Sequence, residues 1–137
     1  MNNWAADLLA NTDALRGEAK THLQAQRWAD AAECLQMLAA IDPLDAWVRQ
    51  WQVIVAIAQD QPETAVQAAQ AALHALPPGE HTARADVLFN LGQALTLLGR
   101  RAEALVALDQ ALVLNPALAC AQQARSRLLA AGPPGQH

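Results

Sequence analysis

The side chains that most often carry chemistry in proteins are few here, and their spacing fits no catalytic or metal-binding pattern. The four histidines, at positions 22, 74, 81 and 137, lack a histidine partner four residues away and a neighbouring cysteine, as a zinc site would require. The one serine, Ser126, and the cysteines Cys34 and Cys120 have no adjacent base to activate a nucleophile. The six glycines are dispersed and form no phosphate-binding loop. We therefore predict a protein that is not an enzyme and uses neither cofactor nor metal.

Aromatic and aliphatic side chains between positions 46 and 58 indicate a different chemistry, the binding of an apolar partner surface. This segment reads AWVRQWQVIVAIA and is apolar on most sides of the helix that it would form. A helix that buries one face on its neighbours should be polar on the other unless something covers it. Exposed aromatic and aliphatic residues are typical of hot spots for a protein partner. The other interpretation is that they pack against the N-terminal segment, through Trp4.

The composition predicts helices that position these residues. Hydrophobic residues make up 53% of the chain and aromatic residues only 4%, with no tyrosine and one phenylalanine. A β-rich protein would need more aromatic and β-branched residues, whereas alanine, which is abundant here, is the best helix former. No run of about 18 apolar residues could span a membrane, and residues 1–7 lack the positive charge of a secretory signal. We expect an all-α protein of the cytoplasm with no membrane insertion.

The charge argues against a nucleic-acid partner. The formal net charge is −4, Lys20 is the only lysine, and the arginines are scattered. Binding of nucleic acid needs clustered basic residues that replace the counterions of the phosphates. The two cysteines lie far apart in sequence, and we expect them to be small buried groups rather than a disulfide.

A repeated pattern explains how the helices would be arranged. Its clearest copy, residues 85–118, places Leu88, Gly92, Gly99, Ala104 and Pro116 at characteristic intervals. The small residues Gly92 and Ala104 suit a close crossing of two helices, Gly99 permits the positive φ that ends the first helix, and Pro116 stops the second. This pattern resembles the tetratricopeptide repeat (TPR), a unit of two antiparallel helices.

Two weaker copies precede the clear one. They cover residues 12–45 and 46–79, and a five-residue insertion, 80–84, separates the second from the third. The second copy departs from the pattern at Arg49, where a large apolar residue is usual. Across the three copies, small residues are expected where paired helices touch; these are Ala19, Ala31, Ala65, Gly92, Ala104 and Ala111.

The expected fold is all-α, a superhelical stack of three TPR helix-turn-helix repeats with a C-terminal capping helix. A single TPR domain would cover residues 1–131, with 132–137 as a flexible tail. The predicted repeat helices are about 13–25, 28–40, 46–59, 62–76, 83–98 and 101–114. The capping helix is predicted at about 117–130, with one face on the last repeat and the other in water. Residues 2–10 could form a further short helix.

The resemblance also implies where a partner would bind. In this family the first helix of each repeat lines a concave groove. The groove residues implied here are Arg16, Lys20, Leu23, Trp47, Gln50, Trp51, Ile54, Ile57, Phe89, Asn90, Gln93 and Leu97. Relatives that grip the charged tails of heat-shock proteins use basic residues in several repeats, but here the third copy offers Asp86, which would repel a carboxylate. We therefore expect an apolar client segment.

A narrower resemblance concerns the kind of client. Residues 22–33, followed by Leu35, Leu38 and Asp42-Pro43, resemble the TPR chaperones of bacterial type III secretion systems. Those virulence chaperones hold a translocator, needle or filament subunit before export. The resemblance implies the same role for this chain. The alternative is a structural TPR adaptor, or a homodimeric scaffold, in a larger protein complex.

Overall fold

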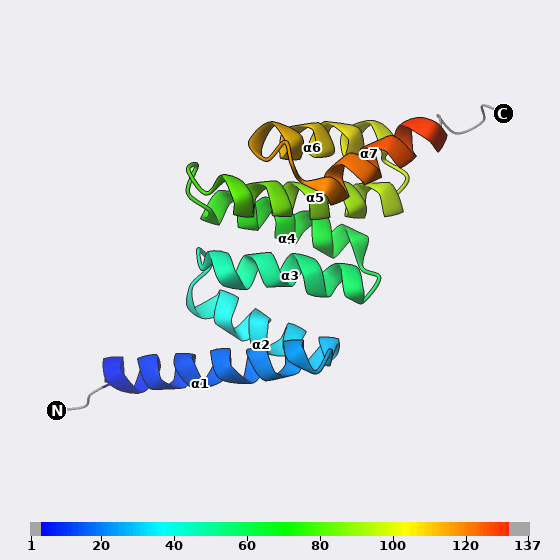
Figure 1. Cartoon of the computed structure of the whole chain (residues 1–137). Coiled ribbons are helices and arrows are strands. Elements are labelled where there is room, and N and C mark those ends of the chain that lie inside the picture. The colour runs from blue at the N-terminus through cyan, green and yellow to red at the C-terminus, as the bar shows by residue number, and fades with distance from the viewer. Residues whose placement is uncertain (1–3, 132–137) are drawn as a thin grey trace.

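A computed structural model describes residues 4–131, and this part of the chain is all-α, with no strand. The helices stack one above another in chain order (Figure 1). Their bounds are α1 Trp4–Gln24, α2 Trp28–Ile41, α3 Ala46–Ala58, α4 Pro62–Ala75, α5 His81–Leu97, α6 Arg101–Leu114 and α7 Ala119–Ala131. The predicted all-helical class and stacked arrangement are confirmed. None of these helices is both long and apolar enough to cross a membrane.

The predicted helix boundaries lie within two residues of the structure except at the start of α1. Residues 4–10 are not a separate helix, because α1 runs without a break from Trp4 to Gln24. The capping helix α7 begins at Ala119 rather than 117, since the amide of Leu118 donates to the carbonyl of Asn115 in a turn. The side chain of Trp4 and the predicted tail 132–137 lie outside the described residues, so packing through Trp4 stays a prediction.

One turn recurs after the first helix of every repeat. It places Gln26, Asp60 and Gly99 at φ values of 57°, 57° and 74°. The residue after each donates its amide to the carbonyl five residues earlier, as from Arg100 to Leu95 at 2.9 Å. This is the Schellman bond, which satisfies carbonyls that a helix end leaves free. The repeat is thus encoded in backbone geometry even where the sequence lacks glycine.

We predict that substitutions in this turn have opposite signs at different repeats. Replacing Gln26 with glycine should stabilise the fold by about 0.5–1 kcal/mol, because a left-handed residue with a Cβ is strained and the gain exceeds the added unfolded-state entropy. Gly99→Ala should cost about 1 kcal/mol for the same reason. Urea unfolding checks both changes. Gly17→Ala is the control, since it lies within α1 with nothing within 4 Å of its added Cβ; it should stabilise, and equal effects at Gly17 and Gly99 would contradict the account.

Small residues lie where the paired helices cross. Ala19, Ala31, Ala65, Ala104 and Ala111 are fully buried, and Gly92 is buried as well. A Cβ on Gly92 would lie 2.9 Å from the side chain of Leu108, so only glycine allows α5 and α6 to pack this closely. The second helices end alike, with the amides of Asp42, Leu76 and Asn115 donating to carbonyls four residues earlier, just before a proline.

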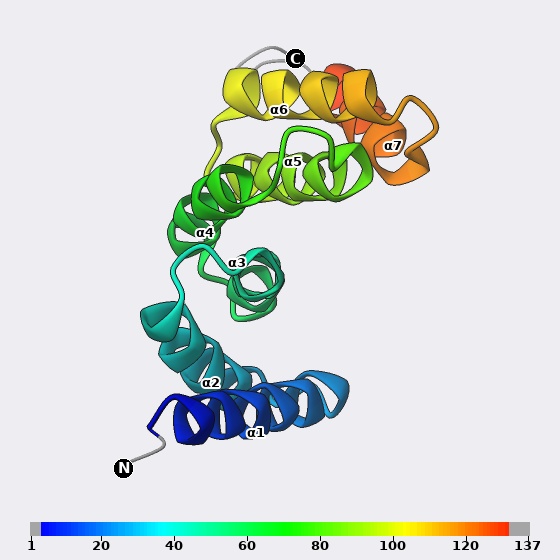
Figure 2. The same cartoon turned by 90° about the vertical axis from the view of Figure 1, so that its left-hand side faces the viewer.

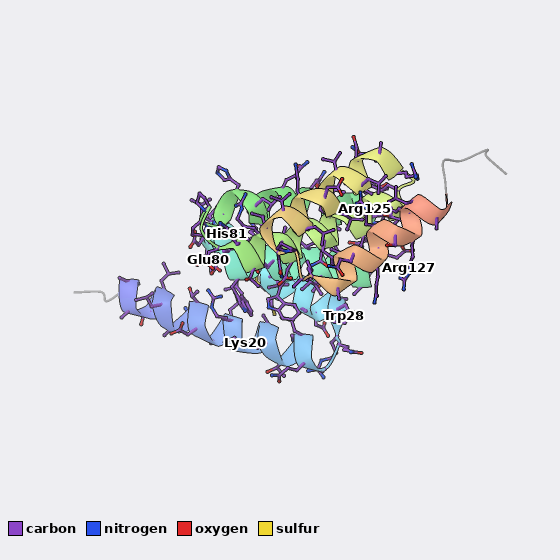
Figure 3. The ribbon with its side chains drawn as sticks, turned by 45° about the horizontal axis from the view of Figure 1, so that its top comes forward. Lys20, Trp28, Glu80, His81, Arg125 and Arg127 are labelled. Carbon is purple, nitrogen blue, oxygen red and sulfur yellow. The ribbon has the colours of Figure 1, made fainter. Side chains whose placement is uncertain are left out.

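The insertion between the second and third repeats is anchored by Arg84. The Nη1 atom of Arg84 donates to the carbonyls of Leu73 and Leu76, at 2.9 and 3.1 Å. A cation at a helix C-terminus is favourable because it faces the negative end of the helix dipole. Arg84 therefore caps α4 from the start of α5 and fixes the longer connection. Glu80 is the last residue of this connection and His81 is the first residue of α5, and Figure 3 shows both on the opposite side of the view from Arg127.

The first repeat is set apart from the rest of the stack. The Cα atoms of α3 and α5 approach within 8 Å, as do those of α5 and α7, whereas α1 and α3 stay further apart throughout the described residues. Helix α2 lies between α1 and α3, and the chain curves so that α3 and α7 lie on the opposite side from α2 and α4 (Figure 2). We call the side of α3, α5 and α7 the concave face.

Candidate binding groove

A depression of about 430 Å³ lies on the concave face between α3, α5 and α7. Its walls are largely apolar, with three polar side chains at the edges, and this volume suits a few side chains of a partner. The lining residues are Ile57, Gln93, Thr96, Leu97, Ala124, Arg127, Leu128 and Ala131. We call this depression the groove. No cluster of three or more potential metal-ligating side chains occurs among the residues that the structure describes.

Helical spacing brings the groove residues together. Gln93, Thr96 and Leu97 follow one face of α5 at intervals of three and four residues, and Ala124, Leu128 and Ala131 do so on α7. The hydroxyl of Thr96 donates to the carbonyl of Gly92 at 2.7 Å, so that its methyl group and not its donor is free for a partner.

Polar contacts fasten α7 in the position where it forms one wall. Arg101 of α6 donates from Nε to the carbonyl of Leu128 at 3.2 Å. Arg125 of α7 pairs with Asp109 of α6 at 2.6 Å. Arg127, two residues further on, is exposed and lines the groove instead (Figure 3). The wall is therefore held by α6 and does not depend on a partner.

Several apolar side chains near the groove are more exposed than packing of the fold requires. Leu97 is 57% exposed and Ile54, on the preceding α3, is 36% exposed. Single exposed apolar residues are ordinary, but an apolar depression with such residues beside it is a typical interaction surface. Of the residues implied by the sequence, Ile57, Gln93 and Leu97 line this groove.

The predicted aromatic anchors on α3 make contacts within the fold. Trp47 and Trp51 are half-buried and pack against the first core cluster, which includes Ala19 of α1 and Leu35 of α2. The guanidinium of Arg16 lies 4.9 Å from the centre of the Trp47 ring, and the Lys20 ammonium lies 5.7 Å from it. Both cations are within the range of a cation–π interaction. These contacts bridge α1 and α3 where their backbones stay apart.

Four other predicted groove residues are also partly or fully occupied within the fold. Leu23 is only 7% exposed and belongs to the first core cluster, so it presents no surface to a partner. Phe89 is half-buried against the cluster that joins α5 to α7. The amide of Gln50 donates to the carbonyl of Ala46 at 3.1 Å. Asn90 is half-buried on α5.

The basic end of the predicted groove is partly neutralised. Arg16 donates from Nη2 to Asp45 at 2.5 Å, and the same carboxylate accepts the amide of Val48 at 3.2 Å as the N-cap of α3. Burial alone would raise the pKa of Asp45, but the hydrogen bond from Arg16, the amide of Val48 and the Arg16 charge together hold that pKa below its ordinary value. Arg16 therefore holds two repeats together, and Lys20 is the exposed cation beside it.

We predict a pH-dependent contribution from Asp45 to stability. Because the folded pKa lies below the unfolded value of about 3.9, the carboxylate stabilises the fold fully above that value, and this is lost as pH falls through the folded pKa. Asp45→Asn keeps an N-cap residue and removes the charge. The substitution should lower the free energy of unfolding by about 0.5–1 kcal/mol at pH 7. This difference from the unmodified chain should shrink as the pH falls below ~4. Urea unfolding at several pH values measures it.

The control for this prediction is Asp109→Asn, which removes an exposed pair, with side chains 43% and 55% exposed. Its effect should be smaller, since exposed pairs are worth little. A gap between the Asp45 variant and the unmodified chain that stays constant from pH 7 to pH ~3 would show that the charge of Asp45 does not act as described.

The sequence-based groove omitted the whole contribution of α7. The capping helix was predicted to cover the last repeat with one face and to meet water with the other, and none of its residues, including Ala124, Arg127, Leu128 and Ala131, was among the predicted groove residues. The structure places all four in the lining of the groove. The face of α7 that covers the last repeat ends at the groove, so residues at the edge of that face also line the groove. The apolar spacing of α7 was visible in the sequence, but its crossing angle over α5 was not.

Comparison with known proteins agrees with this architecture. A family model of the tetratricopeptide repeat matches residues 85–118. The Arabidopsis OM64 TPR domain superposes with a TM-score of 0.77 and 18% identity, covering 87% of this chain and 94% of that one. The first TPR of Spaghetti (RPAP3), bound to the HSP90 peptide SRMEEVD, gives 0.78 and 14% over 88% and 91%. MamA gives 0.80 and 21% over 88% and 68%. No curated protein sequence matches the chain.

The chain therefore has the fold of a tetratricopeptide-repeat solenoid, and its third repeat also matches that family in sequence. Residues 81–114 form the third helix pair, and α7 takes the position of a further first helix against α5.

Proposed function

We propose that this protein binds an apolar segment of a partner protein in the groove between α3, α5 and α7. The observation that carries the proposal is a largely apolar depression whose lining residue Leu97 is exposed, with the exposed Ile54 one helical turn before the lining residue Ile57. An amphipathic helix or an extended strand would bury its apolar side chains there. A fold shared with a peptide-bound TPR domain supports a protein ligand over a small molecule.

The expected client is apolar in its centre and acidic near its ends. Arg127 lies at the α7 edge of the groove, and exposed Lys20 lies on α1, beyond α3. The residues of the concave face between these two cations are mainly uncharged. A client tail that is acidic throughout would therefore find few basic partners there. The cations would set the direction of the client through screened, long-range attraction.

The narrower proposal is a chaperone role. In it, the chain holds an aggregation-prone subunit, such as a type III secretion translocator, needle or filament protein, in the cytoplasm before export. The resemblance of residues 22–33 to such chaperones supports this proposal. Co-expression tests it: with the chain, the subunit from the same host should stay soluble and monomeric. Subunits that aggregate equally with and without the chain would contradict the chaperone role.

A second candidate is self-association, and a specific observation favours it. Leu8 and Leu9 of α1, and Met37, Ile41 and Leu44 in and after α2, are exposed large apolar residues of the first repeat. Light scattering separates the two candidates. A dimer that persists when a client is added supports the adaptor or scaffold, whereas a monomer that forms a one-to-one complex supports the chaperone.

A further inference from the structure

A second cleft, of about 390 Å³, lies between α2 and α4 with α3 as its floor. It is formed by different side chains from the groove and has a different character. Glutamine side chains from all three helices and from the turn before α4 surround it, together with one arginine. The polar residues used below are Arg49 and Gln52 of α3, Gln59 directly after it, and Gln36 and Gln67 of the flanking helices. We call it the amide cleft.

The amide cleft lies where the second repeat departs from the third. Equivalent turns at Asp60 and Gly99 show that the two repeats are offset by 39 positions. Applied to the polar positions 49 and 52 of α3 and 59 directly after it, this offset pairs them with leucines in α5 and directly after it. These are Leu88, Leu91 and Leu98, of which Leu88 is buried and the others half-buried. Three positions that hold apolar packing residues in the third repeat thus hold polar residues in the second repeat, which carries the cleft.

Such a change costs packing energy unless the polar groups have partners. Leu88 and Leu91 fill the core between the third repeat and α7, whereas the amide cleft is open. Sequence rules that stabilise a fold are most often broken where a protein binds something. The polar lining therefore indicates a ligand with polar groups of its own.

Arg49 is positioned to bind an anion. Its Nε donates to the carbonyl of Pro43 and its Nη1 to Oε1 of Gln52, each at 3.0 Å. These bonds fix the guanidinium plane and leave Nη2 without a hydrogen-bond partner in residues 4–131. The side chain is half-buried, and no carboxylate of the described residues lies within 4.0 Å of it. It is a fixed cation without an ion pair, inside a ring of amides.

We propose that the amide cleft binds a carboxylate flanked by amide groups, as in an aspartate or glutamate side chain of an extended peptide. The free edge of Arg49 would take the carboxylate through charge-assisted hydrogen bonds. The glutamine amides around it, such as Gln59 and Gln67, would pair with the peptide N–H and C=O groups, for which a side-chain amide supplies both a donor and an acceptor. This site is separate from the groove, and its test does not depend on the proposed client.

Side-chain NMR of the isotope-labelled chain tests the proposal. The probe is acetyl-Gly-Glu-Gly-amide, and the matched control probe is acetyl-Gly-Gln-Gly-amide. The Arg49 Nε–H signal and the side-chain amide signals of Gln52 and Gln59 should shift saturably with the glutamate peptide. Binding of the glutamine peptide should be weaker by about tenfold or more, since it lacks the charge. Sodium acetate forms a third arm: equal shifts by acetate would assign the site to free carboxylates rather than peptides.

Arg49→Gln should abolish the shifts at the two glutamines, while Arg27→Gln, an exposed arginine of the α1–α2 turn, should leave them unchanged. Arg49→Leu is the second variant, because leucine occupies the equivalent position in the third repeat and should fold at least as stably. Equal shifts by the glutamate and glutamine peptides, no shift by any carboxylate probe, or shifts that persist in both Arg49 variants would overturn the proposal.

Discussion

Leu97→Gln should weaken client binding by about 30-fold to 1,000-fold, the equivalent of about 2–4 kcal/mol for an anchor in the centre of an interface. Leu97 is 57% exposed and lies at the end of α5, where its side chain borders the groove without filling the core. A glutamine there keeps the length of the side chain and its helix propensity, but it cannot give up water to an apolar client without cost. Isothermal titration with the purified client measures the affinity.

The control is Val113→Gln on α6. Val113 is 80% exposed and lines neither depression, so the same kind of change is made on a surface that the account leaves free. Both variants should unfold within about 0.5 kcal/mol of the unmodified chain, as surface substitutions usually do. If Leu97→Gln binds as tightly as Val113→Gln, the groove is not where the client lies.

Gly92 and Leu108 should show the strongest coupling in the fold. Leu108 is 1% exposed, and truncation to alanine should cost about 2–5 kcal/mol of stability. Gly92→Ala alone should destabilise by about 1–2 kcal/mol, because its Cβ would lie 2.9 Å from Leu108 and overpacking outweighs the gain in helix propensity. In the Leu108→Ala background the obstacle is gone, and the same Gly92→Ala change should stabilise by about 0.5–1 kcal/mol.

A double-mutant cycle in urea measures this reversal of sign. The cycle distinguishes whether glycine is needed because Leu108 leaves no room for a Cβ or because of the backbone conformation at position 92. If Gly92→Ala destabilises equally in both backgrounds, the contact between α5 and α6 does not explain why glycine occurs there. Circular dichroism of the double variant should show unchanged helix content.

The repeat architecture was predictable because it is encoded locally. Alanine and glycine at the helix crossings, prolines after the second helices and Gly99 at a turn each have one structural consequence that does not depend on distant residues. The same reasoning predicted that the first repeat helix begins at about residue 13, whereas α1 begins at Trp4. No proline interrupts residues 4–24, and the chain continues through Gly17 as a single helix.

The groove was less predictable because its shape depends on how repeats are placed relative to one another. The resemblance to the TPR implied that Trp47 and Trp51 lie on the concave side, but it could not show that α1 stands away from α3, which lets the two rings fill the space between them. Likewise, Arg16 was read as free for a client, although Asp45, 29 residues later, pairs with it. Neither relation follows from spacing within one repeat.

Site-specific crosslinking tests the groove most directly. Cys34 is buried and its pKa is raised, first by burial and then by Glu18, so it should resist labelling, and Cys120→Ser removes the exposed thiol. In that background, Gln93→Cys carries a photocrosslinker into the groove, and Gln110→Cys carries it to exposed α6. The account predicts that illumination of the client complex joins client to position 93 and not to position 110. Equal yields at both positions, or crosslinks from position 110 alone, would contradict it.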